Sequence, residues 1–472
     1  MKVAFINPPG TYGWYKRPVL GLGYISACLE SNGFDCKIFD AYFNSWSEEE
    51  LLQRVRDYEP NIIGITAMTH QILKAARIAS ELKKQLNTPI IVGGCHVTAL
   101  PEKTLAEFPV FDYAVYGEGE KTITELLRCL HGREEPESCA IEGVAFRSGH
   151  RIVVNEPRPY LTSSELDALP LPAFNHYYGK NRLALADKDS YYVMLTSRGC
   201  PYDCAFCMRA LGKKVRRRTA QNVLHEMEYA IEHYGAHTFD FVDEIFLFDS
   251  RESRELLQLM IDRGFPQRIR WSGLIRANLV KPELIALAKK AGCYRLEMGV
   301  ESGDNEILKA IGKGITVEQV RTAVRIIKKT RISLGTYFIL GHPNETKQTL
   351  RKTVDLAVEL NTDTIAVGLM VPYPGTRISE MASRGEGRYR LLAQDWSEYD
   401  KYCSRALEIE GLPHKELVKW QRRALLNLYL KNFRFFDAFR FFWQRRNACL
   451  FVFKKWIASF KSIITQSGGQ KD

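Results

Sequence analysis

Short apolar runs alternate with amphipathic segments along the first 130 residues. The amphipathic segments, such as residues 47–58 and 72–86, space apolar side chains three or four positions apart, which predicts helices. The apolar runs have the length of buried strands and cover residues 3–6, 36–40, 61–66, 89–94 and 112–117. Because strands that alternate with helices are joined by right-handed crossovers, we predict a doubly wound parallel sheet. Such sheets bind ligands at the carboxyl ends of their strands.

The same alternation returns between residues 190 and 410. Each apolar run there is followed by a loop and an amphipathic stretch such as residues 316–329. The predicted strands are residues 192–197, 238–242, 270–275, 294–300, 333–340 and 364–371. Six strand-helix units are too few for a closed eightfold barrel, so an α/β partial (β/α)6 barrel is predicted, with its chemistry at the carboxyl ends of the strands.

The connecting and terminal segments complete a four-part organisation. Residues 143–155 read as a hairpin, and residues 166–174 form a linker punctuated by proline. We therefore divide the chain into a doubly wound domain, a linker with hairpin, a partial barrel and a C-terminal helical tail. These parts are residues 1–140, 141–189, 190–410 and 411–472.

Composition is that of a globular protein, and the charge lies at one end. Of the 472 residues 45% are hydrophobic and 26% are charged, which excludes a disordered or collagen-like chain. No apolar run approaches the roughly 18 residues of a membrane helix, so we expect a cytoplasmic protein. Residues 413–472 carry 13 Lys and Arg against 3 Asp and Glu, or +10 of the total +11. The body therefore offers no electrostatic argument for nucleic-acid binding.

Three of the eleven cysteines form a cluster. The others are isolated, which is typical of reduced thiols in the cytosol. Cys200, Cys204 and Cys207 follow a predicted strand on one loop, so their sulfurs can converge on one inorganic centre. Zinc needs a fourth ligand, for which His233 or His237 is available. An iron-sulfur cluster held by three thiolates is the other interpretation.

The CxxxCxxC spacing, with Phe206 before its last cysteine, resembles the radical S-adenosylmethionine (SAM) superfamily. The resemblance implies that Cys200, Cys204 and Cys207 hold a 4Fe-4S cluster whose open iron chelates SAM. Later strand ends agree with it. The resemblance implies that Asp243 and Glu244 bind the methionine ammonium group and that Arg276 pairs with its carboxylate. Further implied contacts are Glu301 for the ribose hydroxyls and the loops 341–343 and 372–376 for adenine and substrate.

The first domain resembles the flavodoxin-like cobalamin-binding domain that precedes the radical core in one large subfamily. Glycine at its strand ends would let the backbone lie against a corrin edge or nucleotide tail. A flavodoxin-like domain for another nucleotide, or for none, is the alternative. The matching residues, which the resemblance implies as cobalamin contacts, are Asn7, Pro8, Thr66, Met68, Gly93, Gly94, Gly117 and Glu118.

One departure from the subfamily concerns cobalt ligation. Many cobalamin domains carry Asp-x-His-x-x-Gly after the first strand, and the histidine ligates cobalt from below. This chain has Asn7-Pro8-Pro9-Gly10 there, so we predict base-off cobalamin without that histidine. His70 and His96 stay candidates near the lower face, or are ordinary loop residues.

The basic tail also carries many aromatic residues. Apolar side chains recur at helical spacing between lysines, as in residues 453–464. Such a helix suits a membrane surface or a partner, or its apolar face packs on the barrel. The aromatic positions are Trp420, Phe433, Phe435, Phe436, Phe439, Phe442, Trp443, Phe453, Trp456 and Phe460.

The resemblance implies an enzyme that uses a 4Fe-4S cluster, SAM and cobalamin to methylate an unactivated carbon. A small-molecule or lipid-like substrate and an electron donor such as flavodoxin or ferredoxin are the implied partners, with no nucleic acid. Peripheral membrane contact through the C-terminal helices is a further expectation. Two alternatives stay open: an oxidative or cyclising enzyme that resembles the anaerobic magnesium-protoporphyrin ester cyclases, and a cobalamin-binding sensor.

Overall fold

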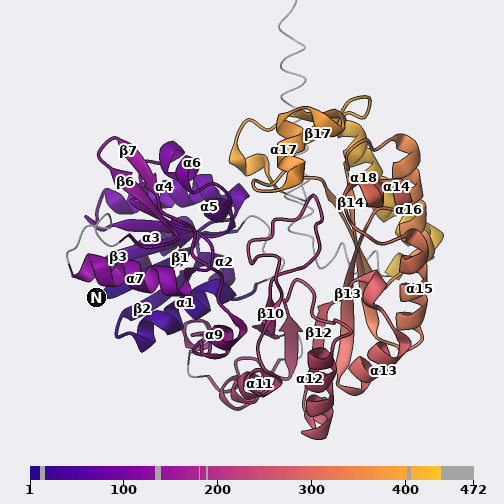
Figure 1. Cartoon of the computed structure of the whole chain (residues 1–472), viewed down its shortest axis with the longest axis horizontal. Coiled ribbons are helices and arrows are strands. Elements are labelled where there is room, and N and C mark those ends of the chain that lie inside the picture. The colour runs from indigo at the N-terminus through magenta and orange to yellow at the C-terminus, as the bar shows by residue number, and fades with distance from the viewer. Residues whose placement is uncertain (11–15, 133–139, 180, 188–189, 401–404, 437–472) are drawn as a thin grey trace, which may run out of the picture.

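The computed structural model describes residues 1–10, 16–132, 140–179, 181–187, 190–400 and 405–436. Two lobes lie side by side (Figure 1). The first lobe, indigo to purple, is built on a seven-stranded sheet, and the second, magenta to orange, on a six-stranded sheet. Both the doubly wound domain and the partial barrel predicted from the sequence are therefore confirmed.

The first sheet has the strand order β2-β1-β3-β4-β5-β6-β7, with β1 to β5 parallel. The order 2-1-3-4-5 is the flavodoxin-like one. The parallel strands are β1 (Lys2–Asn7), β2 (Asp35–Asp40), β3 (Ile62–Thr66), β4 (Ile90–Gly93) and β5 (Tyr113–Val115).

Alternation along β1 explains why helices cover both faces of this sheet. Val3 and Phe5 pack on one face with α1 (Leu20–Ser31) and α7 (Gly119–His131). The intervening residues of β1 pack on the other face with α3 (Glu48–Tyr58) and α4 (Ile72–Lys83). Successive side chains of a strand point to opposite faces, so a strand that is apolar throughout is buried on both.

The predicted hairpin is present, and it belongs to the first sheet. Strands β6 (Val144–Ser148) and β7 (Arg151–Val154) pair antiparallel, and β6 also pairs antiparallel with β5. The remaining elements of this lobe are short: η1 (Thr69–Gln71), α2 (Ala41–Asn44), α5 (Cys95–Ala99), α6 (Pro101–Glu107), α9 (Ser163–Asp167) and α10 (Asn175–Tyr178). Hydrogen-bonded pairing therefore extends the doubly wound sheet past residue 140.

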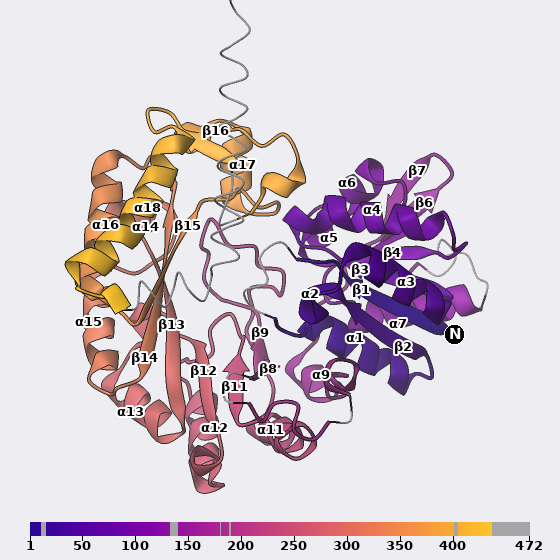
Figure 2. The same cartoon turned by 180° about the vertical axis from the view of Figure 1, so that it is seen from behind.

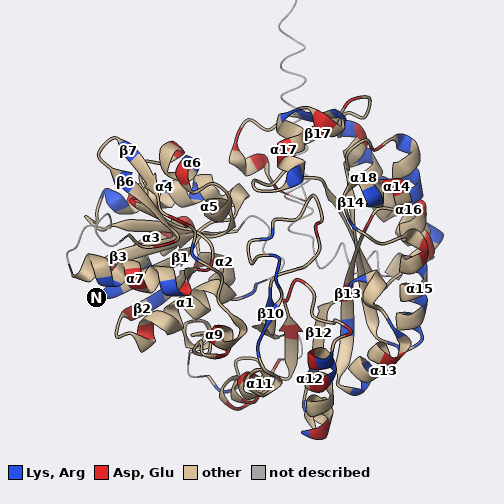
Figure 3. Cartoon of the chain, viewed as in Figure 1, with Lys and Arg blue, Asp and Glu red and all other residues tan. Residues whose placement is uncertain are grey.

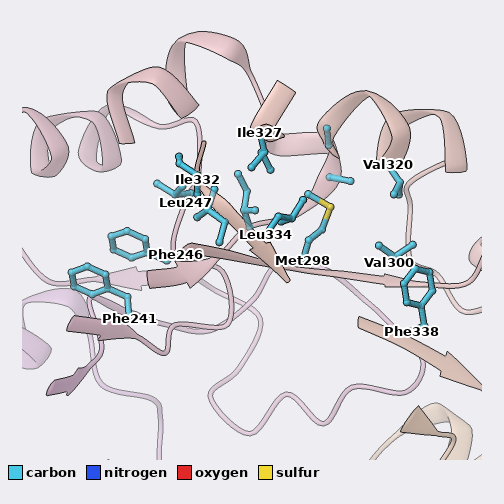
Figure 4. Packing of buried hydrophobic residues seen from close by; sticks show 14 of the residues in the cluster. Phe241, Phe246, Leu247, Met298, Val300, Val320, Ile327, Ile332, Leu334 and Phe338 are labelled. Carbon is cyan, nitrogen blue, oxygen red and sulfur yellow. The ribbon is translucent and has the colours of Figure 1, made fainter. Parts of the chain in front are cut away.

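The second sheet runs in chain order, β8-β11-β12-β13-β14-β15, and all its pairs are parallel. Apolar side chains of strands and helices form its core, where Met298, Leu334 and Phe338 lie near Val320 and Ile327 of a covering helix (Figure 4). The strands are β8 (Tyr192–Met194), β11 (Thr238–Phe241), β12 (Arg270–Leu274), β13 (Cys293–Glu301), β14 (Ser333–Leu340) and β15 (Thr364–Leu369). The helices are α11 (Ala220–Tyr234), α12 (Arg251–Asp262), α13 (Pro282–Lys290), α14 (Asn305–Ala310), α15 (Val317–Lys328), α16 (Lys347–Leu360) and α17 (Arg377–Ser383).

The last described elements cover the far edge of the barrel. Helix α18 (His414–Lys431) lies against α16 and β15 (Figure 2), where its Leu417 and Leu428 are buried. The antiparallel pair β16 (Tyr389–Leu391) and β17 (Leu407–Ile409) precedes it. The aromatic positions of the tail beyond residue 436 lie outside the described residues. Among the described residues, no helix is long and apolar enough to cross a membrane.

The carboxyl ends of the two sheets face each other. Gly375, in the loop after β15, approaches Ala99 of α5 so closely that a Cβ at Gly375 would lie 3.3 Å from the Ala99 Cβ. Trp396 of η5 (Trp396–Glu398) crosses to the first domain and donates to Glu107 of α6 at 2.6 Å. The predicted ligand-binding edges of the two domains therefore lie opposite each other, across the interface between the domains.

One expectation about the cysteines is wrong. Cys129, on α7, is disulfide-bonded, whereas the sequence pattern predicted isolated thiols. Seven described cysteines are free, and they include Cys200, Cys204 and Cys207.

Candidate functional site

The cysteine loop lies at the carboxyl end of the first barrel strand. A two-stranded ladder forms its base: β9 (Ser197–Arg198) precedes the loop and β10 (Arg216–Arg217) follows it. Between them, Gly199 has φ +95° and a Cβ there would lie 2.3 Å from the Lys214 carbonyl oxygen, so only glycine fits. The Ala205 N–H donates to the Ile311 carbonyl at 2.8 Å, which ties the loop to the end of α14.

The three thiols are free and partly accessible. Cys200 and Cys204 are half-buried and Cys207 is exposed. The described part of the chain contains no group of three His, Cys, Asp or Glu side chains already arranged around one metal position. Burial raises the pKa of the Cys204 thiol, and the cations Lys313 and Arg276 act against that rise. Positive charge beside the loop favours thiolates, the form that binds iron.

The zinc alternative is not supported by the positions of its fourth ligands. His237 directly precedes β11, at the amino end of the sheet, whereas the cysteine loop lies at the carboxyl end. His233, in the last turn of α11, stacks on Tyr229 and bonds through Nδ1 to the Tyr229 carbonyl. Neither histidine therefore approaches the cysteines to close a four-ligand site.

Glu301 ends the fourth barrel strand, and its side chain forms a buried ion pair. The register of β13 shifts between Gly299 and Glu301, and Glu301 adopts φ +72°. A bulge of this kind re-aims a side chain. The Glu301 Oε1 accepts from Lys313 Nζ at 2.7 Å, and a Cβ at Gly299 would lie 2.2 Å from that oxygen, so a larger residue there would displace the Glu301 side chain. Lys313 also lies 5.8 Å from the centre of the Phe206 ring, so the cysteine loop and the fourth strand end meet here.

His342 brings the fifth strand end to the same place. Its ring is 6.4 Å from the Phe206 ring, and Nε2 lies 3.3 Å from the Glu301 carbonyl oxygen. The Nδ1 atom is buried and has no hydrogen-bond partner. Burial lowers the pKa of His342 to about 4, so the ring is neutral near pH 7. Glu345 accepts from the Gly341 and His342 N–H groups and holds this turn.

Arg276 follows the third barrel strand, and its guanidinium group stacks on an aromatic ring of the cysteine loop. Its guanidinium carbon lies 3.6 Å from the centre of the Tyr202 ring in the cysteine loop, a cation-π contact. Nη1 donates to Asn278 at 3.3 Å, while Nη2 is buried without a hydrogen-bond partner. The stacking leaves one edge of the guanidinium free for an anion.

The two carboxylates after the second barrel strand differ. Asp243 is fully buried and accepts from the Thr196 N–H, the Thr196 hydroxyl and the Ser197 hydroxyl, the last at 2.6 Å. This carboxylate therefore joins β11 to the start of the cysteine loop and has little capacity left for a ligand. Glu244 is different, because its Oε2 is buried and has no partner. Burial raises the pKa of Glu244, as expected for a carboxylate that lacks its counterion.

The unpaired atoms fit the cofactor that the sequence implies. Glu244 Oε2, Arg276 Nη2 and His342 Nδ1 end three different strands around one loop, and each is buried without a partner. Buried polar groups are normally hydrogen-bonded, so unpaired atoms on three strand ends that border the cysteine loop indicate a polar ligand. A carboxylate and a guanidinium match the ammonium and carboxylate of a methionine moiety. The residues present therefore fit SAM beside a cluster on the cysteines.

The strand ends of the first domain present mostly backbone. Gly94 has φ +104°, and a Cβ there would lie 2.7 Å from the Ala67 carbonyl oxygen, so β3 and β4 approach each other as only glycine allows. Gly117 has φ +79° with open space around its Cα, and its N–H donates to Thr98 at 3.2 Å. Gly93 and Thr66 are half-buried and Met68 is exposed. Open backbone at adjoining strand ends fits a large flat ligand.

Two of the expected cobalamin contacts point elsewhere. Asn7 is buried and donates through Nδ2 to Asp40 at 2.8 Å, so its amide serves the β1–β2 junction. Glu118 is buried against the barrel, where it pairs with Arg198 at 3.1 Å and Arg216 at 2.9 Å. Both side chains are therefore engaged within the protein. Pro8, which directly follows Asn7, is buried.

His96 lies where the first domain meets Trp396 of the second. Its ring is buried, lies edge-on to Trp396 at 4.9 Å, and has an Nδ1 atom without a partner. Burial lowers the pKa of His96 to about 4. His70, in η1, is half-buried at the end of β3.

Several residues of the site were not identified from the sequence. They are Tyr202, Lys313, Glu345 and the arginines of β9 and β10. Lys313 had a usable signal, since it stands between Gly312 and Gly314, both at positive φ. Tyr202 and the arginines that pair with Glu118 carry no local pattern, because their partners come from distant parts of the chain. Glu345 differs, since it accepts from the nearby Gly341 and His342 N–H groups.

Two family models match the chain. Residues 194–357 match the Radical SAM superfamily, and residues 15–127 match the B12 binding domain. A relative in Pyrococcus horikoshii, the uncharacterized methyltransferase PH0819, is 30% identical over 91% of this chain and 93% of its own length. The anaerobic magnesium-protoporphyrin IX monomethyl ester cyclase of Cereibacter sphaeroides is 27% identical over 96% of this chain and 75% of its own.

A solved structure has the same architecture. The radical SAM methyltransferase TsrM of Kitasatospora setae, with cobalamin and a [4Fe-4S] cluster bound, superposes with a TM-score of 0.71 over 91% of this chain and 88% of that chain, at 18% identity. Fold and site thus define a two-domain enzyme with a cobalamin module ahead of a radical-generating barrel. The chain belongs to the radical SAM superfamily, in the group whose members carry a B12-binding domain. Its cofactors are a 4Fe-4S cluster, SAM and cobalamin.

Proposed function

We propose that this protein is a cobalamin-dependent radical SAM methyltransferase that acts on an unactivated carbon of a small molecule. The observation that carries the proposal is the presence of buried, unpaired polar atoms on three strand ends beside the cysteine loop, on the edge that faces the strand ends of the first domain. When bound, the cofactors supply a 5'-deoxyadenosyl radical for hydrogen abstraction and a cobalt centre for methyl transfer.

The side chains of the barrel position and shield the reactants. Cys200, Cys204 and Cys207 are proposed to hold the cluster, and Phe206 packs beside them. Glu244 accepts hydrogen bonds from the methionine ammonium group, and Arg276 donates to the methionine carboxylate through its free edge. Glu301, paired with Lys313 through one oxygen, has its second oxygen for the ribose hydroxyls. In this assignment Asp243 orients the loop and does not touch the cofactor.

In the first domain we propose that the backbone at Thr66, Met68, Gly93, Gly94 and Gly117 receives cobalamin. The bound form is base-off, and the loop after β1 supplies no histidine. Absorbance and electron paramagnetic resonance spectra of bound cobalamin report the axial ligands directly. A base-on or histidine-ligated spectrum would contradict this assignment.

The domain limits follow the same division. We propose residues 1–140 as the cobalamin-binding domain, 190–410 as the radical SAM core and 411–472 as an appended tail. The intervening residues 141–189 include the hairpin that adds two strands to the first sheet.

Product analysis under reducing, anaerobic conditions tests the function. A methyltransferase consumes SAM in two ways, so both 5'-deoxyadenosine and S-adenosylhomocysteine are expected. The second candidate is a cyclising enzyme, favoured by the similarity to the ester cyclase over 96% of this chain. A cyclase forms 5'-deoxyadenosine without S-adenosylhomocysteine. Formation of neither product by cluster-loaded protein would contradict both functions.

The partners of the tail are a separate proposal. Helix α18 exposes Leu426 and Leu430, and Phe433, just after the helix, has 80% of its surface exposed. With the +10 balance of residues 413–472, this apolar stripe fits an anionic membrane surface and a lipid-like substrate. Co-sedimentation with anionic and neutral vesicles at low and high salt tests it. Equal binding to both vesicle types, or none, would contradict it. The electron donor, flavodoxin or ferredoxin, is tested by supplying each in turn.

A further inference from the structure

A buried cluster of four charged side chains joins the two cofactor domains. Arg198 and Arg216 stand opposite each other in the β9–β10 ladder, so both point to the same side, toward the first domain. The basic stretch that includes β10 appears in blue at the junction of the lobes (Figure 3). Their partners are Glu118 and Glu120, at the start of α7. All four side chains are at most 7% exposed.

Every bond in this cluster has good geometry. Glu118 accepts from Arg198 at 3.1 Å, from Arg216 at 2.9 Å and from the Leu161 N–H at 2.7 Å. Glu120 accepts from Arg198 at 2.6 Å. Arg216 also donates to the Leu161 carbonyl at 2.8 Å. The carboxylates are therefore satisfied within the protein and need no ligand.

The cluster touches both cofactor loops. Glu118 follows Gly117 at the carboxyl end of β5, where the first domain presents open backbone. Arg198 stands two positions before Cys200, and Arg216 reaches back to the Leu211 carbonyl in the returning limb of the cysteine loop at 2.6 Å. A displacement of the first domain would thus move the base of the cysteine loop.

We propose that Glu118 is a positioning residue that sets the cysteine loop against the strand ends of the first domain, through Arg198 and Arg216. Charged hydrogen bonds are directional, whereas an apolar contact of equal area would let the domains slide. The inference rests on the proposed function, because a fixed distance between the two cofactors matters only if SAM on the barrel reacts with a centre in the first domain.

The test uses Glu118→Gln in the full chain, with Glu125→Gln as the matched control. Glu125 lies on the same helix and also pairs with an arginine, Arg158, but the Glu125 side chain is 45% exposed and remote from the loop. The first readout is hydrogen exchange in the cofactor-free protein. We expect faster exchange in residues 197–199 and 211–217 for Glu118→Gln only, with the strands of both sheets unchanged.

The second readout is the ratio of the two SAM products in reconstituted protein. Formation of 5'-deoxyadenosine takes place at the barrel and needs SAM, the cluster, one electron from the added reductant and one hydrogen atom from the substrate or the buffer. S-adenosylhomocysteine forms only when the methyl group of SAM is transferred to a centre in the first domain. We expect Glu118→Gln to keep its cluster, its cobalamin affinity and its 5'-deoxyadenosine rate within about twofold, and to lose S-adenosylhomocysteine roughly tenfold, as a misplaced reactant does. Arg198→Lys, which keeps the charge but not the fork of donors, should lie between the variant and the unmodified protein.

The possible results separate the inference from the function on which it rests. Weaker cobalamin binding by Glu118→Gln, unchanged exchange at the cysteine loop, or an equal product loss in Glu125→Gln would overturn the positioning role. If the unmodified protein makes no S-adenosylhomocysteine, methyl transfer fails, while the exchange data still decide whether Glu118 holds the loop. If Glu118→Gln does not fold, Arg198→Lys carries both measurements.

Discussion

The strand ends of the two domains are built in opposite ways. In the barrel, charged and polar side chains end the strands, and four of the described ones have a buried atom without a hydrogen-bond partner: Glu244, Arg276, His342 and Glu345. In the first domain the predicted contacts are glycines and open backbone, and the motif side chains Asn7 and Glu118 are engaged within the protein.

The difference follows the ligands. A small zwitterion such as the methionine part of SAM is recognised by a few charges at fixed points, which must be particular residue types. A large flat macrocycle is recognised by shape, which requires the absence of side chains where it lies. The charged site of the barrel can therefore be predicted from sequence motifs. The backbone site of the first domain can be predicted only where a glycine is sterically required, as at Gly94.

The largest effect is expected from the cysteines. Replacing Cys200, Cys204 and Cys207 together with alanine should reduce iron content, cluster absorbance and 5'-deoxyadenosine to background, because three thiolates are the proposed protein ligands. Cobalamin binding should persist, since the first domain has its own core. Cys28→Ala, at a buried position of α1, is the control and should keep its cluster. Normal iron in the triple variant, or tightly bound zinc in the unmodified protein, would contradict the assignment.

The next largest effects are expected at the neighbouring carboxylates Asp243 and Glu244. Glu244→Gln should weaken SAM binding about 10- to 100-fold at nearly unchanged stability, because it removes a charged hydrogen bond worth about 1.5–3 kcal/mol. Asp243→Asn should instead lower the free energy of unfolding by about 1–3 kcal/mol, because an amide cannot accept from Thr196 and Ser197 as the carboxylate does. Equilibrium SAM binding and denaturant unfolding measure the two. The reverse pattern would exchange the roles of the two carboxylates.

In the first domain, Gly94→Ala tests whether the close approach of the backbone at the strand ends matters for cobalamin binding. It should destabilise the domain by about 1–3 kcal/mol and weaken cobalamin binding, because the added Cβ meets the Ala67 carbonyl, which cannot move cheaply. Gly33→Ala is the matched control, since Gly33 also has positive φ, +82°, but open space around it. Unfolding curves and cobalamin titrations give both numbers. Equal effects at the two glycines would show that strain alone, and not close approach, is responsible.

The last prediction is a pH dependence at the His342 turn. Burial raises the pKa of Glu345 from 4.5 to about 8, so between these values the folded state keeps a proton that the unfolded chain releases. Stability should therefore fall as pH rises through this window, by at most about 1.4 kcal/mol per pH unit. Glu345→Gln should flatten the slope measured by urea unfolding at pH 5 to 8. In the first domain, burial raises the pKa of Asp40 only to about 6, so its contribution should end near that pH. An unchanged slope in Glu345→Gln would contradict the assignment.

Local patterns in the sequence were sufficient for the elements and for the cysteine loop. Hydrophobic period separates strands from helices, and the alternation of the two leaves few topologies, so the parallel strands of both sheets were predicted correctly. The hairpin β6–β7 was predicted as part of a separate linker, whereas it pairs with β5 and extends the first sheet. The carboxyl ends of parallel strands share one edge, which also brought Phe206, Arg276, Glu301 and His342 into one neighbourhood without any knowledge of distances.

Only the tertiary structure decided which side chains are available to a ligand and which are engaged within the protein. Glu118 meets arginines that lie 80 and 98 positions away, and Asn7 meets a carboxylate 33 positions away. The hydrophobic pattern of the sequence does not predict such pairs, because the partner of a buried charge is set by the tertiary structure. For the same reason Asp243 and Glu244 look equivalent as neighbours in the chain, and only the packing of β11 against the cysteine loop separates a structural carboxylate from one left open for a ligand.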